Sequence, residues 1–253
     1  TDAKLNYSDE LTGDAYRVAD LNLAVREVSP VSEMPFDIAA KLDIVMKSGA
    51  KISGPVSLSG LVKAESSGAS FEKARFSVFV KLDDALVQYG SGAATLFEKK
   101  PGTALNLQTD GNASVDSAQI SSYKLTLSKS VVAGSLGVVA KAQQVELSLT
   151  AKAEGIDLST VGDVSPIAKQ YHLTGKLALD AQAQGPSNSI DYDGTVKISD
   201  MTLDSELMKQ PLDLDADLAI STDQIKKVSL KLTAKDFDIG VTGSIQNFSA
   251  PKF

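Results

Sequence analysis

The stretch LDLDADLAISTDQIKKVSLKLTAKDFDIGVTGSI, residues 212–245, decides the fold class. Apolar residues, or Gly243, occupy every second position in each of its three runs, and charged or small residues, Ala219 among them, stand between them. Successive side chains of a β-strand point to opposite faces, so this period predicts three strands that each have an apolar and a polar face. Short connections between the runs favour antiparallel neighbours.

The same alternation recurs along the chain in about fourteen runs, most of them followed by Gly, Asn, Asp, Ser or Pro. Helical periodicity is scarce. The best helical candidate spans 157–170, where Asp157 or Ser159 can cap and Pro166 interrupts, and an irregular or helical patch spans 83–97. We therefore predict a mainly β fold, a long antiparallel sheet with one or two short helices. Residues 1–253 are treated as one segment, with a candidate subdivision near 155–172 at a short helical linker.

The size of such a sheet limits what its apolar face can do. About fourteen strands of about eight residues give one face of roughly 1,600 Å². Monomers rarely expose an apolar patch larger than a few hundred Å², and open sheets beyond about ten strands curl or split. The apolar face must therefore meet itself, another sheet or a hydrophobic guest. A two-sheet sandwich, a closed barrel and a curled gutter lined with aliphatic side chains all remain open.

Composition excludes several classes of function. The chain has 25 Lys and Arg against 32 Asp and Glu, a formal net charge of −7, and no basic cluster for nucleic acid. It has no Cys, which excludes thiolate metal sites and a cysteine nucleophile. The chain has a single histidine, His172, which excludes multi-histidine metal sites. Any Ser-His-Asp triad would have to use this histidine. We expect no enzyme, no metal and no cofactor.

Two acidic motifs have simple structural interpretations. The segment DLDADL, residues 213–218, resembles the start of a calcium loop. Position six of that loop is Leu218 and position twelve is Gln224, where Gly and Glu are required. We interpret the segment as the polar face of a strand. The segment DYDG, residues 191–194, is typical of a turn.

No stretch resembles a membrane-spanning helix, which needs about 20 apolar residues. The longest nearly apolar run, residues 131–140, includes glycine and serine. Any membrane anchor is therefore expected outside this segment. Aromatic residues make up only 6% of the chain and there is no Trp, so the apolar face is aliphatic and lacks stacking platforms for bases or sugars.

Four stretches, in order, carry a family resemblance: KLNYSDELTGDAYRVADLNLAV (4–25) with MPFDIAAKLDI (34–44), KLDDALVQYGSGAATLFEKKPGTALNL (81–107), LTGKLALDAQAQGP (173–186) with YDGTVKISDMTL (192–203), and DIGVTGSIQNFSAPKF (238–253). Their order and glycine-punctuated strands resemble the AsmA family of Gram-negative envelope proteins. In the second stretch the Lys-Pro-x-Gly pattern of the family is shortened to Lys-Pro-Gly-Thr.

That family is grouped with bridge-like lipid-transfer proteins, whose long antiparallel sheets curl into a hydrophobic groove. The resemblance implies a segment in the periplasm, part of an inner-membrane-anchored envelope protein, that shields acyl chains between the inner and outer membranes and supports outer-membrane homeostasis. A phospholipid or another acyl lipid is the implied partner, and the membrane is reached through an anchor outside this segment.

The apolar positions of the last strands are the expected groove lining. The predicted lipid-groove residues are Leu177, Leu179, Val196, Ile198, Leu214, Leu218, Leu230, Leu232, Ile239, Val241 and Ile245. Their alternating neighbours Asp213, Asp215, Lys231 and Asp238 are expected to face water. The alternative is a non-catalytic extracytoplasmic β-sandwich for adhesion or scaffolding, in which two apolar faces fill each other. A dry core would indicate the sandwich, and a continuous void or bound lipid would indicate the groove.

Overall fold

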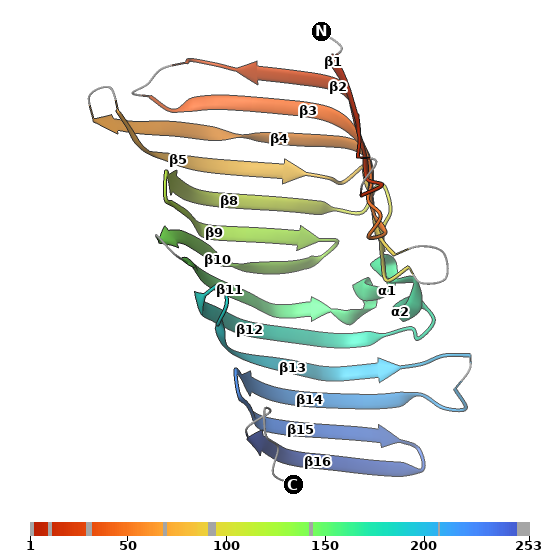
Figure 1. Ribbon diagram of the computed structural model, residues 1–253. Coiled ribbons are helices and arrows are strands. Elements are labelled where there is room, and N and C mark those ends of the chain that lie inside the picture. The colour runs from red at the N-terminus through yellow and green to blue at the C-terminus, as the bar shows by residue number, and fades with distance from the viewer. Residues whose placement is uncertain are drawn as a thin grey trace. The chain divides into compact units, whose positions relative to one another are not determined.

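The computed structural model describes residues 3–9, 12–28, 32–67, 70–90, 95–141, 144–206 and 208–246. These residues form sixteen strands, and the pairings within each unit described below are antiparallel (Figure 1). The predicted mainly β, antiparallel fold class is confirmed, and in the described residues the helical content is confined to one short segment.

The chain divides into two compact units, Thr1–Ser128 with Asp163–Ile167, and Lys129–Gly162 with Ala168–Phe253. The main division between the units therefore follows Ser128. The short stretch Asp163–Ile167, which belongs to the first unit although its neighbours in sequence belong to the second, lies inside the range 155–172 that the sequence suggested as a boundary.

The first unit is a single-layered sheet in the order β1–β2–β3–β4–β5–β8–β9, with β6 paired to β4 and β7. Its strands are β1 (Ala3–Ser8), β2 (Ala15–Val25), β3 (Met34–Val45), β4 (Ala50–Ser67), β5 (Ser70–Lys81), β6 (Leu86–Tyr89), β7 (Phe97–Lys99), β8 (Leu105–Ser114) and β9 (Ser117–Leu127). The helical alternative for 83–97 is wrong in its described part, because a turn and the strands β6 and β7 occupy it.

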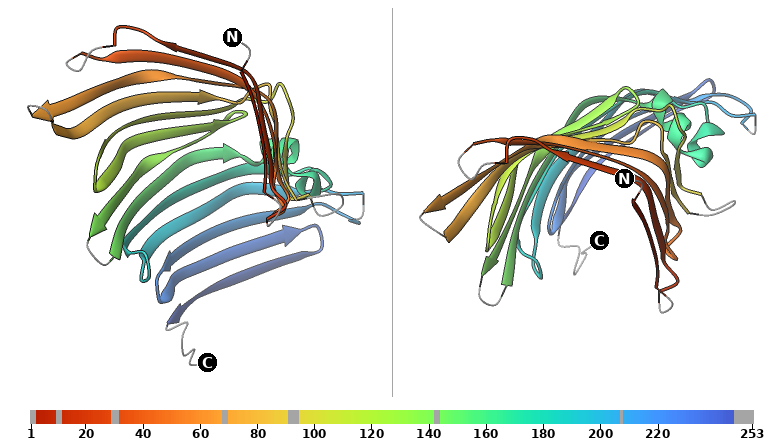
Figure 2. Two further views of the ribbon diagram at one scale, coloured as in Figure 1. Left: turned by 45° about the horizontal axis from the view of Figure 1, so that its top comes forward. Right: turned by 90° about the horizontal axis from the view of Figure 1, so that it is seen from above.

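β4 carries the bend of the first unit. Its residues 50–53 pair with β6, and its residues 57–67 pair with β5. β5 and β6 therefore lie one after the other along the same edge of β4, with the turn 82–85 between them. Gly54 has φ +130° at this point and is followed by Pro55, which has no N–H to donate. A β-bulge lies between Ala19 and Asn22 in β2. Figure 2 shows β2, β3 and β4 turning sharply along their lengths.

The second unit is a meander in the order β10–β11–β12–β13–β14–β15–β16. Its strands are β10 (Ser130–Lys141), β11 (Gln144–Asp157), β12 (Thr174–Pro186), β13 (Asp191–Leu203), β14 (Leu212–Ser221), β15 (Gln224–Ala234) and β16 (Phe237–Gln246). Each strand pairs with the next through a short connection, except that the helical segment separates β11 from β12. Within the described residues of this unit the pairing does not return from β16 to β10.

The helical segment lies where the sequence predicted it. It consists of the 3₁₀ turn η2 (Leu158–Thr160) and the one-turn helices α1 (Val161–Val164) and α2 (Pro166–Lys169). Asp157 caps η2: its carboxylate accepts hydrogen bonds from the Ser159 hydroxyl at 2.7 Å and the Ser159 N–H at 3.0 Å, which hold the pKa of this carboxyl below its ordinary value. Pro166 opens α2, where a missing N–H costs nothing.

Few side chains are fully buried in this architecture. Among the described residues, the buried apolar side chains are Ala85, Ala153, Leu158, Val164 and Ala216. A layered domain of this length would bury dozens of larger side chains in a close-packed core. The aliphatic residues of the strands are instead half-buried, covered by their neighbours within the sheet and open to one side.

Candidate functional site

The candidate site is the apolar face of the second unit. In an antiparallel pair, directly opposed residues share one face of the sheet, so the register decides which side chains lie together. One row of opposed residues runs Leu177, Ile198, Ala216, Leu230, Val241 from β12 to β16. A second runs Leu179, Val196, Leu218, Val228, Gly243, and a third runs Met201, Leu214, Leu232, Ile239.

All eleven residues predicted to line a groove lie on this face. Ten of them stand in the three rows, and Ile245 lies on the same face because it opposes Ile225. Two β-bulges extend this face to Met201 and Ile225. The bulge between Ile198 and Met201 and the one between Ile225 and Val228 each insert one residue, which keeps the apolar residues on either side of it on the same face. The sequence did not show these bulges, because each depends on the register of a neighbouring strand.

The apolar face is only partly covered. None of the eleven residues is fully buried, whereas Ala216 in the middle of the face is 5% exposed. Exposure rises at the last strand, where Ile239 and Val241 are each 51% exposed. Because these aliphatic side chains are partly exposed to water, a guest that covers them is stabilised by about 25 cal/mol for each Å² of apolar surface buried.

A hollow of about 250 Å³ lies on this face. Its floor is the row of small residues Ala151, Ala181 and Gly194, which are opposed across β11, β12 and β13. Larger side chains stand on both sides, Leu179 and Val196 in one neighbouring row and Leu149 and Tyr192 in the other. A Cβ at Gly194 would lie 3.2 Å from the Ala181 Cβ, so the floor is tightly packed. The hollow is a shallow, open apolar pocket rather than a closed cavity.

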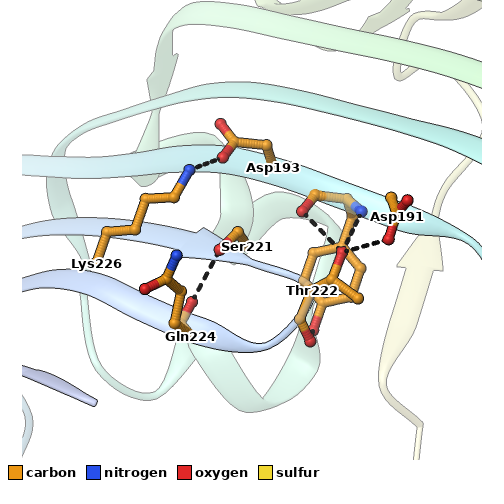
Figure 3. Close-up of polar contacts among 7 residues, drawn as sticks. Asp191, Asp193, Ser221, Thr222, Gln224 and Lys226 are labelled. Carbon is orange, nitrogen blue, oxygen red and sulfur yellow. Dashed lines mark hydrogen bonds and ion pairs between the residues drawn. The ribbon is translucent and has the colours of Figure 1, made fainter. Parts of the chain in front are cut away.

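Tyr192 lines the hollow and is held there by polar contacts with Thr222. Figure 3 shows the polar cluster around Thr222, Asp191 and Asp193. The Tyr192 N–H donates to the Thr222 Oγ1 at 2.8 Å, and the Tyr192 phenol donates to the Thr222 carbonyl at 3.4 Å. The Thr222 hydroxyl lies 3.3 Å from the Asp191 carboxylate, and Lys226 pairs with Asp193. These contacts tie the start of β13 to the β14–β15 turn, so the aromatic ring has a fixed position.

The segment DYDG does not form a turn. Residues 191–194 are the first residues of β13, and the turn precedes them, with the Ser189 N–H donating to the Pro186 carbonyl. Pairing of Tyr192 with Ala183 and of Gly194 with Ala181 outweighs the turn preference of Asp and Gly. Tyr192 was consequently not predicted as part of the site, although it shares the period of two with Val196 and Ile198.

The predicted polar neighbours lie on the other face. Asp215 opposes Lys231, and Asp213 and Asp238 both oppose Thr233. Asp215 has a structural role: its carboxylate accepts the N–H of Asp200 at 2.9 Å, in the bulge of β13. The carboxylates of DLDADL thus follow a strand, and the described residues contain no group of three or more acidic or histidine side chains arranged for a metal ion.

The first unit has an apolar face of the same kind. One row of opposed residues runs Ile38, Leu58, Val80, Leu107, Leu125, and the next contains Phe36 and Gly60. The Phe36 ring lies over Gly60, with its Cζ 3.0 Å from where a Cβ would be. Only residues of the C-terminal strands were predicted to line a groove, yet the alternation over β3, β4 and β5 carries the same information.

One cavity of the first unit is different in character. It has a volume of about 530 Å³, lies at the bend, and is lined by charged residues of both signs, including Asp20, Lys41, Lys81 and Asp83. Lys81 and Asp83 form an ion pair at 3.4 Å. Charged side chains of both signs therefore stand beside apolar lining residues such as Ala39, Pro55 and Val56.

Comparisons with known proteins do not identify the chain. No family model, no curated protein and no solved structure matches it. In the part of the chain that the structure describes, no helix has both the length and the apolar character needed to cross a membrane.

Proposed function

We propose that this chain is a lipid-binding segment of an AsmA-like lipid-transfer protein, with no catalytic activity. Its ligand is a phospholipid or another acyl lipid, whose chains lie on the apolar face while the headgroup stays in water. The protein resides in the periplasm, is anchored in the inner membrane outside this segment, and moves lipid between the two membranes to support outer-membrane homeostasis.

The observation that carries the proposal is the continuous, half-exposed apolar face of the second unit. Its rows of aliphatic residues cross every strand from β12 to β16, and the hollow over Ala181 lies within them. Burial of a methylene group contributes about 0.8 kcal/mol, so several methylenes on this face supply useful affinity without a polar cage. Because no polar cage surrounds the headgroup, this face does not select one headgroup over another.

The location and the transfer activity are supported by the family resemblance of the four sequence stretches quoted above. The lack of catalysis is supported by the composition, because the single His172 and the absence of Cys leave few nucleophile and base combinations. The adhesion or scaffolding alternative needs no guest, so lipid occupancy separates the two functions.

The test compares lipid content in two matched variants. Ala181→Leu fills the floor of the hollow, whereas Ala178→Leu makes the same change in the same strand on the polar face, opposite Lys197. The chain and both variants are expressed in bacteria and purified without detergent, and organic extracts are analysed by mass spectrometry. Phospholipid bound per mole is expected to fall several-fold in Ala181→Leu and to stay at the parent level in Ala178→Leu.

A parent chain that carries no acyl lipid, and that does not take up a fluorescent fatty acid, would overturn the proposal and favour scaffolding. Equal lipid content in all three proteins would show that lipid binds elsewhere than at the hollow. Thermal melting of each variant establishes that both are folded.

A further inference from the structure

The outer edge of β16 is an unpaired strand edge. Among the described residues β16 pairs only with β15, so the backbone N–H and C=O groups on its other side have no strand partner. All ten of its residues, Phe237 to Gln246, are exposed. Such an edge is a template for another strand.

β16 lacks the features that usually protect an edge. It contains no Lys, Arg or Pro, and it is ten residues long. The one bulge in its ladder places the extra residue in β15, so β16 itself is regular. By contrast β1, which ends the sheet of the first unit, has six residues and carries Lys4.

The apolar face also reaches this edge without a polar border. Ile239, Val241 and Ile245 continue the rows of the second unit, and Gly243 lies among them. Nothing lies within 4 Å of where a Cβ on Gly243 would be, so there is a gap in the face beside Val241. An added strand with the same alternation would extend the apolar face and fill this gap.

We propose that β16 pairs antiparallel with β16 of a second copy, centred on Thr242, to form a symmetric dimer. Residues opposed in this register have numbers that add to 484. Val241 then opposes the second copy's Gly243 and fills the gap, and Ile239 opposes the second copy's Ile245. Every apolar residue stays on the apolar face, because the period of two is preserved.

The charges of β16 permit this pairing. Its one ionisable side chain, Asp238, is paired with Lys231 at 3.7 Å and would oppose the second copy's Gln246 rather than another carboxylate. Like charges directly opposed across strands destabilise a pair, and this register contains none. A ten-residue strand pair is small beside standard interfaces of about 1,600 Å², so the dimer is expected to dissociate on dilution.

The test uses the self-opposed position. Thr242 is exposed on the polar face opposite Ser229, so Thr242→Lys and Thr242→Glu leave the fold of each chain intact. Molar mass is measured by sedimentation over a wide range of protein concentration. The parent chain is expected to shift from monomer to dimer, each variant alone to stay monomeric, and an equimolar mixture of the two variants to regain the dimer through opposed Lys and Glu.

Thr195→Lys, an exposed position in β13 within the sheet, is the matched control and should dimerise like the parent. A parent chain that stays monomeric at all concentrations would overturn the proposal. So would a Thr242→Lys variant that still dimerises, or a mixture of the two variants that does not. The proposal goes beyond lipid binding, and the measured mass of the protein tests it whether or not lipid is bound.

Discussion

Lys99 is a charged residue with a structural role inside the first unit. Its side chain is 0% exposed, and its ammonium donates to the carbonyls of Leu82, Asp83 and Ala85, at 2.5 Å for Asp83 and 2.7 Å for Ala85. Burial lowers the pKa of this ammonium, and the carboxylates of Asp83 and Asp84 partly oppose the shift. The lysine thereby satisfies three backbone acceptors at the turn where β5 gives way to β6.

We predict that Lys99→Met destabilises the first unit by roughly 2–4 kcal/mol, because buried carbonyls lose their donor. Urea unfolding followed by circular dichroism measures this change. Lys100→Met is the matched control, since Lys100 is exposed and its ion pair with Glu98 is 3.7 Å long. Equal losses in both variants would contradict the role assigned to Lys99.

At the scale of the element, β4 shows how one strand is bent without being broken. Gly54 has a positive φ, and a Cβ there would lie 2.9 Å from the Ala85 Cα and 3.0 Å from the Asp84 carbonyl oxygen. The turn held by Lys99 therefore packs directly on Gly54. Only glycine combines this backbone conformation with so close an approach.

Gly54→Ala is expected to destabilise the first unit by about 1–3 kcal/mol, through backbone strain and the clash with the turn. Gly155→Ala in β11 provides the comparison, because nothing lies within 4 Å of its added Cβ. Hydrogen exchange should show faster exchange in β4 and β6 for Gly54→Ala alone. Unchanged protection in these strands would show that the bend does not require glycine.

For the whole molecule, the main feature is the scarcity of a packed core. Stability comes from cross-strand neighbours and backbone ladders, and both units leave an aliphatic face partly open. A charge placed on such a face can reach water when no guest is bound. The same charge in a sandwich core would be buried without a partner at a cost of several kcal/mol.

Leu230→Asp is therefore predicted to reduce bound lipid several-fold while lowering the free energy of unfolding by less than about 2 kcal/mol. Val241→Asp should behave in the same way nearer the edge. Ala219→Asp is the control, because Ala219 lies on the polar face opposite Lys227. Paired measurements of thermal melting and lipid per mole decide the outcome. A Leu230→Asp variant that fails to fold would indicate a closed core, and one with normal lipid would place the ligand elsewhere.

The sequence by itself determined the strand type, the antiparallel pairing of the last strands and the common face of the alternating apolar residues within them. These properties follow from the period of two and from short connections, which are local. The common face of Leu177, Leu230 and Val241 was predictable for this reason. The helical segment at 157–170 was predictable from its caps.

Only the tertiary structure decided the bulges, the bend and the hollow. The bulge at Asp200 needs the carboxylate of Asp215 from the next strand, and the bend needs Lys99 from a distant one. Tyr192 joins the site because pairing with Ala183 holds residues 191–194 in a strand that their composition disfavours. Each of these features depends on contacts between different strands or turns, which the pattern within one strand does not contain.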